Sequence, residues 1–84
     1  FPNPFNASVT VWLDMPEACR LEVDVYDMLG RPVRQILAEQ RSAGPWHAAW
    51  DGRDERGQAA ASGPYFIVIQ AAGQRHNIRV MLLR

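Results

Sequence analysis

The chain has 84 residues, of which nine are acidic and nine basic, so its formal net charge is zero. This length allows one small domain, and a hydrophobic content of 48% is enough for a single packed core. The balanced charge argues against a nucleic-acid binder, which shows a basic face, and against a polybasic membrane anchor. Because Cys19 is the only cysteine, no internal disulfide can form.

The first half of the chain predicts four short strands, because apolar residues alternate with polar ones by twos. They cover residues 9–13, 21–25, 33–37 and 46–50. A helix competes over residues 32–40, where apolar residues also occur at helical spacing, but the turn at Gly30 favours an antiparallel return. In the fourth strand, Trp46, Ala48 and Trp50 share one face and are expected in the core.

The second half begins with the most polar run of the chain, residues 51–57, which predicts a surface loop. Residues 65–72 are apolar on both faces and predict a central strand. Pro64 lacks an N–H, so the start of this strand is expected at an edge or unpaired. A turn at Gly73 leads into a last strand over residues 78–82. Short strands separated by Gly/Pro turns are typical of an all-β sandwich or barrel.

Several motifs follow one another in a specific order: Phe1–Pro2–Asn3–Pro4–Phe5–Asn6, Tyr26–Asp27–Met28–Leu29–Gly30–Arg31, Trp50–Asp51–Gly52–Arg53–Asp54, Gly57, and Ser62–Gly63–Pro64–Tyr65–Phe66. In order and spacing they resemble the C-terminal sorting domain (type A) of the type IX secretion system. They are also similar to the immunoglobulin-like domain of flagellar hook-capping proteins. The resemblance implies an all-β, immunoglobulin-like antiparallel sandwich of about seven strands over residues 1–84. Since the chain begins with Phe1, we expect it to be a fragment of a longer secreted protein.

For function, the resemblance implies a non-catalytic sorting signal that directs its parent protein across the outer membrane to the cell surface or the medium. Its partners would be the outer-membrane secretion translocon with its sorting machinery and the upstream cargo domain. The positions that match family motifs or the recognition surface are Pro2, Asn3, Pro4, Phe5, Gly30, Trp50, Asp51, Gly52, Gly57, Gly63, Tyr65, Arg79 and Arg84. On the last strand the family carries Lys, where this Lys-free chain has arginine.

Some of these residues also have a physical interpretation. Each Asn–Pro step disfavours helix, so residues 2–4 should run extended, and Phe1 and Phe5 could then cover one end of the sandwich. Gly63 would allow a close approach of backbone as the next strand begins. Tyr65 would bury its ring and keep its hydroxyl near the edge.

Two other functions stay open. The domain could be a structural or assembly module, like a hook-cap domain or an adhesive spacer, that remains attached to its parent. It could also be a carbohydrate-binding accessory domain, for which Trp12, on the polar face of its strand, is the best exposed aromatic residue.

Signs of catalysis are weak. Asp51, Asp54 and Glu55 are a weak candidate for calcium, because arginines lie among them and EF-hand spacing is missing. Nothing in the sequence brings Cys19 close to His47 or His76, as a nucleophilic pair requires. We therefore expect neither an enzyme nor a cofactor.

Overall fold

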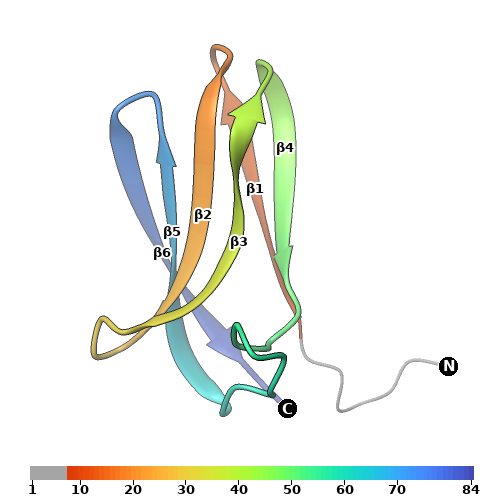
Figure 1. Cartoon of the computed structure of the whole chain (residues 1–84), viewed down its shortest axis with the longest axis vertical. Helices are drawn as coiled ribbons and strands as arrows, with labels where there is room; N and C mark the ends of the chain where they lie inside the picture. Colours follow the sequence, from red (N-terminus) through yellow and green to blue (C-terminus); the bar gives the residue numbers. More distant parts are fainter. Residues whose placement is uncertain (1–7) are drawn as a thin grey trace, which may run out of the picture.

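The computed structural model describes residues 8–84, which form six β-strands in two antiparallel sheets (Figure 1). The strands are β1 (Val9–Met15), β2 (Cys19–Asp27), β3 (Pro32–Arg41), β4 (Gly44–Trp50), β5 (Gly63–Ala71) and β6 (Gln74–Leu82). Strands β1 and β4 pair with each other, and the other four form a sheet in the order β3–β2–β5–β6. The predicted all-β sandwich is confirmed, and the segment for which a helix competed is strand β3.

The resemblance implied about seven strands, whereas the described residues form six. Between β4 and β5 the chain makes only an isolated bridge, Arg53 with Ala59, instead of a further strand. The reason is local. Asp51 Oδ1 accepts a hydrogen bond from the backbone N–H of Arg53, and Asp54 Oδ1 accepts from Arg56 and Gln58. The side chains thus accept hydrogen bonds from backbone N–H groups that, in a strand, would bond to the carbonyls of a neighbouring strand.

The core lies between the inward faces of the two sheets. The alternating residues Leu21, Val23 and Val25 of β2 are at most 1% exposed, as their pattern predicts. From the facing sheet, Ala48 and Trp50 are buried and Trp46 is half-buried against the same cluster. The shared face of β4 is therefore confirmed.

Trp50 and Tyr65 pack against each other at one end of this core. Their rings meet edge to face, with centroids 4.9 Å apart, which is a favourable arrangement of aromatic quadrupoles. The Tyr65 hydroxyl donates to the carbonyl of Ala61, four residues upstream, at 2.6 Å. This contact corresponds to the tyrosine corner of immunoglobulin-like sandwiches. The prediction of a buried ring with its hydroxyl at the edge is confirmed.

Strand β5 is central, with β2 on one side and β6 on the other. Its apolar pattern on both faces is explained because Val68, which points away from the core cluster, is still only 2% exposed. Pro64 pairs with Met81 of β6 but lies one residue beyond the last pair with β2, Tyr65 with Asp27. One side of Pro64 is therefore unpaired, as its missing N–H requires.

The expectation that Gly63 allows a close approach of backbone was wrong. A Cβ built at Gly63 would meet nothing within 4 Å, so a side chain there would not clash with neighbouring backbone. Its φ of 145° is what disfavours an L side chain there. Gly30, in the turn between β2 and β3, and Gly52 and Gly57, in the loop after β4, also have positive φ.

The two-residue turn between β5 and β6 offers a stabilising substitution. Ala72 and Gly73 both have positive φ, 52° and 74°, and their flanks Ala71 and Gln74 pair directly, so this is a type I′ hairpin turn. Among residues 8–84, Ala72 is the only non-glycine residue with positive φ. Because Asn tolerates this region better than Ala, we expect Ala72→Asn to raise the free energy of unfolding by about 1 kcal/mol.

Urea denaturation monitored by circular dichroism measures this gain. Ala43→Asn is the matched control, since Ala43 is an exposed turn residue without positive φ. An equal effect of both substitutions would show that the turn conformation is not the cause.

Candidate functional site

The predicted recognition residues do not converge on one site. Pro2, Asn3, Pro4 and Phe5 lie outside the described residues, as does the proposed cover by Phe1 and Phe5. Among the others, Trp50 and Tyr65 belong to the core, and Gly30, Gly52, Gly57 and Gly63 shape turns. Arg79 and Arg84 lie at the C-terminal end of the chain, and their surroundings differ.

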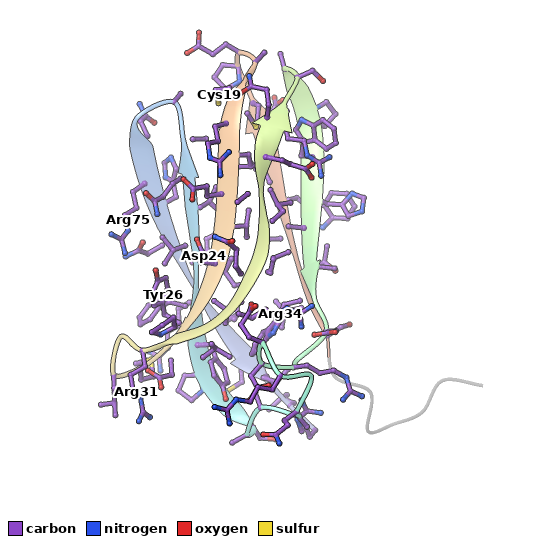
Figure 2. All side chains as sticks on the ribbon, viewed as in Figure 1. Cys19, Asp24, Tyr26, Arg31, Arg34 and Arg75 are labelled. Atoms are coloured by element: carbon purple, nitrogen blue, oxygen red, sulfur yellow. The ribbon has the colours of Figure 1, made fainter. Side chains whose placement is uncertain are left out.

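The acidic residues of the polar loop are used to hold the loop against β3. Arg34, on β3, points toward this loop (Figure 2), and its Nη1 lies 3.0 Å from Asp51 Oδ1. Glu55 donates its backbone N–H to the carbonyl of Val33 at 3.2 Å and accepts from the N–H of Gln35 at 2.6 Å. Glu55 therefore takes the place of a neighbouring strand along part of the free edge of β3.

This arrangement bears on the candidate metal site. Asp51 faces Arg34, Asp54 faces the backbone of its own turn, and Glu55 faces β3. In the described part of the chain, no three His, Cys, Asp or Glu side chains gather as a metal site requires. What the sequence missed is Arg34, because only the fold brings it next to a loop that begins seventeen residues later.

Arg84 closes the same end of the sandwich from the C-terminal side. Its Nε donates to the carbonyl of Ala60 at 2.6 Å, and its Nη2 donates to the carbonyl of Gly52. Its backbone N–H donates to Ser62 Oγ at 3.2 Å. Arg84 thus joins the terminal segment to the loop after β4. A guanidinium is suited to this because it presents several donors in a fixed fork.

Arg75 and Arg79, unlike Arg84, project from the surface of the sheet. Both are exposed on the face of β6 that points away from the core, and neither makes an ion pair among residues 8–84. Arg75 and Tyr26 project from the same side of the molecule (Figure 2). The residues opposite the two arginines on β5 are Gln70 and Phe66, which are neutral.

Trp12 is 74% exposed, as its place on the polar face of β1 predicted. Its register partner on β4 is His47, and the two rings lie 4.9 Å apart at 42°. The half-buried Trp46, on the opposite face of β4 from His47, makes a cation–π pair, with the guanidinium of Arg41 4.4 Å from its ring centre. The exposed Trp12 therefore lies beside one histidine ring, and carbohydrate binding at this position remains a prediction.

A groove opens between β1 and β6, at the end formed by the β1–β2 turn and the β5–β6 turn. It has a volume of about 520 Å³, and its apolar lining includes Leu13, Met15, Ile69, Ala71 and Ile78. Asp14 and Glu17 lie on the β1 side. Cys19 and His76 also line it. The groove is thus an apolar recess with an acidic margin.

Asp24 and Asp27, both on β2, are expected to change stability with pH in opposite directions. Partial burial raises the pKa of Asp24, and the nearby Glu22 and Glu55 raise it further, against a hydrogen bond with Gln35. The pKa of Asp27 is lowered, chiefly by the hydrogen bond from the Arg31 backbone N–H, which is 2.9 Å long.

A raised pKa in the folded state means that Asp24 favours folding when protonated, so its contribution is lost as pH rises above about 4. We expect Asp24→Asn to be more stable than the parent sequence at pH 7 and equal to it near pH 3. The lowered pKa of Asp27 has the opposite sign, so Asp27→Asn should be less stable at pH 7, with the difference vanishing as the pH falls below the folded-state pKa. Urea denaturation at both pH values measures this, and equal signs for the two variants would contradict it.

No helix among residues 8–84 is long and apolar enough to cross a membrane. No curated protein matches the chain significantly. Several solved structures do share its fold. FlgD from P. aeruginosa is 28% identical, with a TM-score of 0.70 over 89% of this chain and 59% of its own. FlgD from Xanthomonas campestris, described in connection with the hook capping essential for flagellar assembly, is 25% identical, with a TM-score of 0.71 over 92% of this chain and 58% of its own.

A third structure, dimeric latent PorU from Porphyromonas gingivalis, is 22% identical, with a TM-score of 0.66 over 96% of this chain and 8% of its own. At this identity the likeness shows the fold alone. This chain therefore spans less than two thirds of each of these proteins. The sequence model of the FlgD Ig-like domain matches residues 5–75. Because this match covers most of the sequence and agrees with the fold, the chain belongs to the family of FlgD Ig-like domains.

Proposed function

We propose that the domain is a non-catalytic structural module that joins its parent protein to a larger protein assembly outside the cytoplasm. The observation that carries this proposal is the match of the FlgD Ig-like domain over residues 5–75. One solved relative in this family, FlgD of Xanthomonas campestris, is described in terms of hook capping and flagellar assembly. A contact role requires a stable sandwich with an accessible surface.

The distribution of side chains supports a contact role. Arg34, Arg84 and Asp27 hold turns and loops within the domain. Besides Trp12 on β1, large apolar side chains are exposed at the β2–β3 turn, with Met28 and Leu29, and at the terminal segment, with Met81 and Leu83. Exposed apolar residues that gather at an edge are typical of interaction surfaces.

The test compares the parent protein with a version that lacks residues 8–84. We expect the intact parent to sediment with its assembly and to retain the domain, as detected by an antibody against residues 8–84. The deleted version should be found free. A deleted parent that still sediments with the assembly would overturn the structural role.

A second candidate is a sorting domain recognised by an outer-membrane translocon, which would bring the parent to the cell surface or the medium. It is favoured by the exposed Arg75 and Arg79 on the last strand, which make no ion pair within residues 8–84. The test fuses residues 1–84 to a reporter in a bacterium with a type IX system. A reporter that stays in the periplasm would contradict this function.

The arginines need separate treatment in that test. Arg79→Ala removes a charge without removing a described contact, so it examines recognition. Arg84→Ala also removes the hydrogen bonds to Ala60 and Gly52, so its effect on export would mix recognition with folding.

A further inference from the structure

The two edges of the four-stranded sheet are treated differently by the fold. The β3 edge is irregular and partly covered. Its pairing with β2 has two register shifts, its first residue is Pro32, and Glu55 occupies the backbone groups of Val33 and Gln35. Bulges, proline and a covering loop are the usual means of preventing further strand pairing.

The β6 edge has none of these protections within the described residues. All nine residues from Gln74 to Leu82 pair with β5 in one unbroken register, without proline or a bulge. The four residues at its beginning, 74–77, are all exposed. The far edge of β6 therefore presents a regular row of backbone donors and acceptors, which can template one more strand.

The side chains of β6 specify what kind of strand fits. Arg75, Asn77 and Arg79 lie on the outer face, while Ile78 faces the groove between β6 and β1. Residues directly opposite one another in a ladder share a face. In an added strand, the side chains opposite Arg75 and Arg79 would thus meet guanidinium groups. The side chains between them would enter the apolar groove of about 520 Å³.

We propose that the β6 edge and the adjoining groove bind an extended segment of a partner protein in which acidic and apolar residues alternate. Two carboxylates four residues apart would pair with Arg75 and Arg79. Apolar side chains between them would contact Leu13, Ile69 and Ile78 in the groove. Asp14 and Glu17 on its margin repel acidic residues from the inward positions and so fix the register.

A second copy of this chain fits less well. If the β6 strands of two copies paired with each other, Arg75 and Arg79 of both copies would lie on facing strands. Like charges on facing strands are destabilising. A strand in which acidic and apolar residues alternate is accommodated elsewhere in this sheet. In β2, Leu21, Val23 and Val25 point inward and Glu22 and Asp24 point outward. The charges therefore favour a separate, acidic partner.

Such a segment would be the partner through which the proposed structural module joins its assembly. The role of the site in the cell rests on the proposed function, whereas peptide binding to the β6 edge does not. The probe is a capped, fluorescently labelled peptide, GVEVTVEVG, whose glutamates are four residues apart. Its binding to residues 1–84 is measured by fluorescence anisotropy. We expect saturable binding that weakens with added salt, together with slower amide hydrogen exchange along β6.

Single charge reversals supply the controls. Arg79→Glu and Arg75→Glu should each weaken binding by about tenfold, whereas Arg56→Glu, in the exposed loop, should leave the affinity unchanged. Circular dichroism confirms that each variant is folded. A peptide with lysine in place of glutamate should not bind.

Three results would overturn the inference: no binding by the acidic peptide, equal binding by the lysine peptide, or protection of β3 instead of β6. A concentration-dependent dimer, seen by sedimentation and changed in affinity by Arg79→Glu but not by Arg56→Glu, would assign the edge to a second copy and would also overturn it. Loss of peptide binding with an intact effect of the domain deletion on assembly would refute the edge site and leave the structural role standing.

Discussion

Replacing Trp50 with alanine is expected to lower the free energy of unfolding by about 3–5 kcal/mol. Trp50 is 1% exposed, its ring meets Tyr65 edge to face, and its indole N–H donates to the carbonyl of Arg53 at 2.9 Å. The substitution removes a large buried side chain, leaves a cavity, and takes away the shorter of the two hydrogen bonds to the Arg53 carbonyl, the other being that from Arg34 Nη1 at 3.4 Å. A domain of this size has a total stability of about 4–13 kcal/mol, so the loss is a large part of it.

Trp12→Ala is the matched control. Trp12 is 74% exposed, and its aromatic partner among residues 8–84 is the exposed His47 ring, so its removal should change stability by less than about 0.5 kcal/mol. Urea denaturation measured by far-ultraviolet circular dichroism compares the two, because tryptophan fluorescence itself changes with the substitutions. Equal losses would contradict the assignment of Trp50 to the core and of Trp12 to the surface.

If Trp50→Ala is too unstable to fold, Trp50→Phe keeps the comparison possible. Phenylalanine retains an aromatic ring against Tyr65 but loses the donor to Arg53, so an intermediate loss is expected. A loss as small as that of Trp12→Ala would show that the contacts of the indole contribute little.

The sequence predicted the strands well because one physical rule, alternation by twos, decides which side chains are buried. Leu21, Val23 and Val25 needed no other information, and the same rule placed Trp12 outside and Trp50 inside. The number of strands was predicted less well, since it came from the family resemblance. Asp51 and Asp54 turn the intervening segment back on itself through local hydrogen bonds.

The candidate site was less predictable because it depends on contacts between residues distant in sequence. Arg34 meets Asp51, and Arg84 meets Gly52, only after both sheets have formed. No local pattern distinguishes Arg84, which closes the loop, from Arg79, which is exposed without an ion pair among residues 8–84. Likewise, the open edge of β6 becomes visible only when the order of strands and the cover over β3 are known.

The terminal segment allows a comparison of two adjacent leucines. Leu82, the last residue of β6, is 1% exposed and pairs with Gly63, whereas the next residue, Leu83, is 73% exposed. We expect Leu82→Ala to lower the free energy of unfolding by about 2–5 kcal/mol. Leu83→Ala should change it by less than about 0.5 kcal/mol. Urea denaturation of both variants at one pH measures the difference.

This pair also separates folding from recognition at the C-terminal end. If the segment acts only through the stability of the sandwich, Leu82→Ala should disturb both assembly and export, and Leu83→Ala neither. If a partner binds the exposed side chains of the segment, Leu83→Ala should weaken that binding while the domain keeps its full stability. Similar stability losses for both leucines would show that the last strand continues beyond Leu82 and that Leu83 is part of the core.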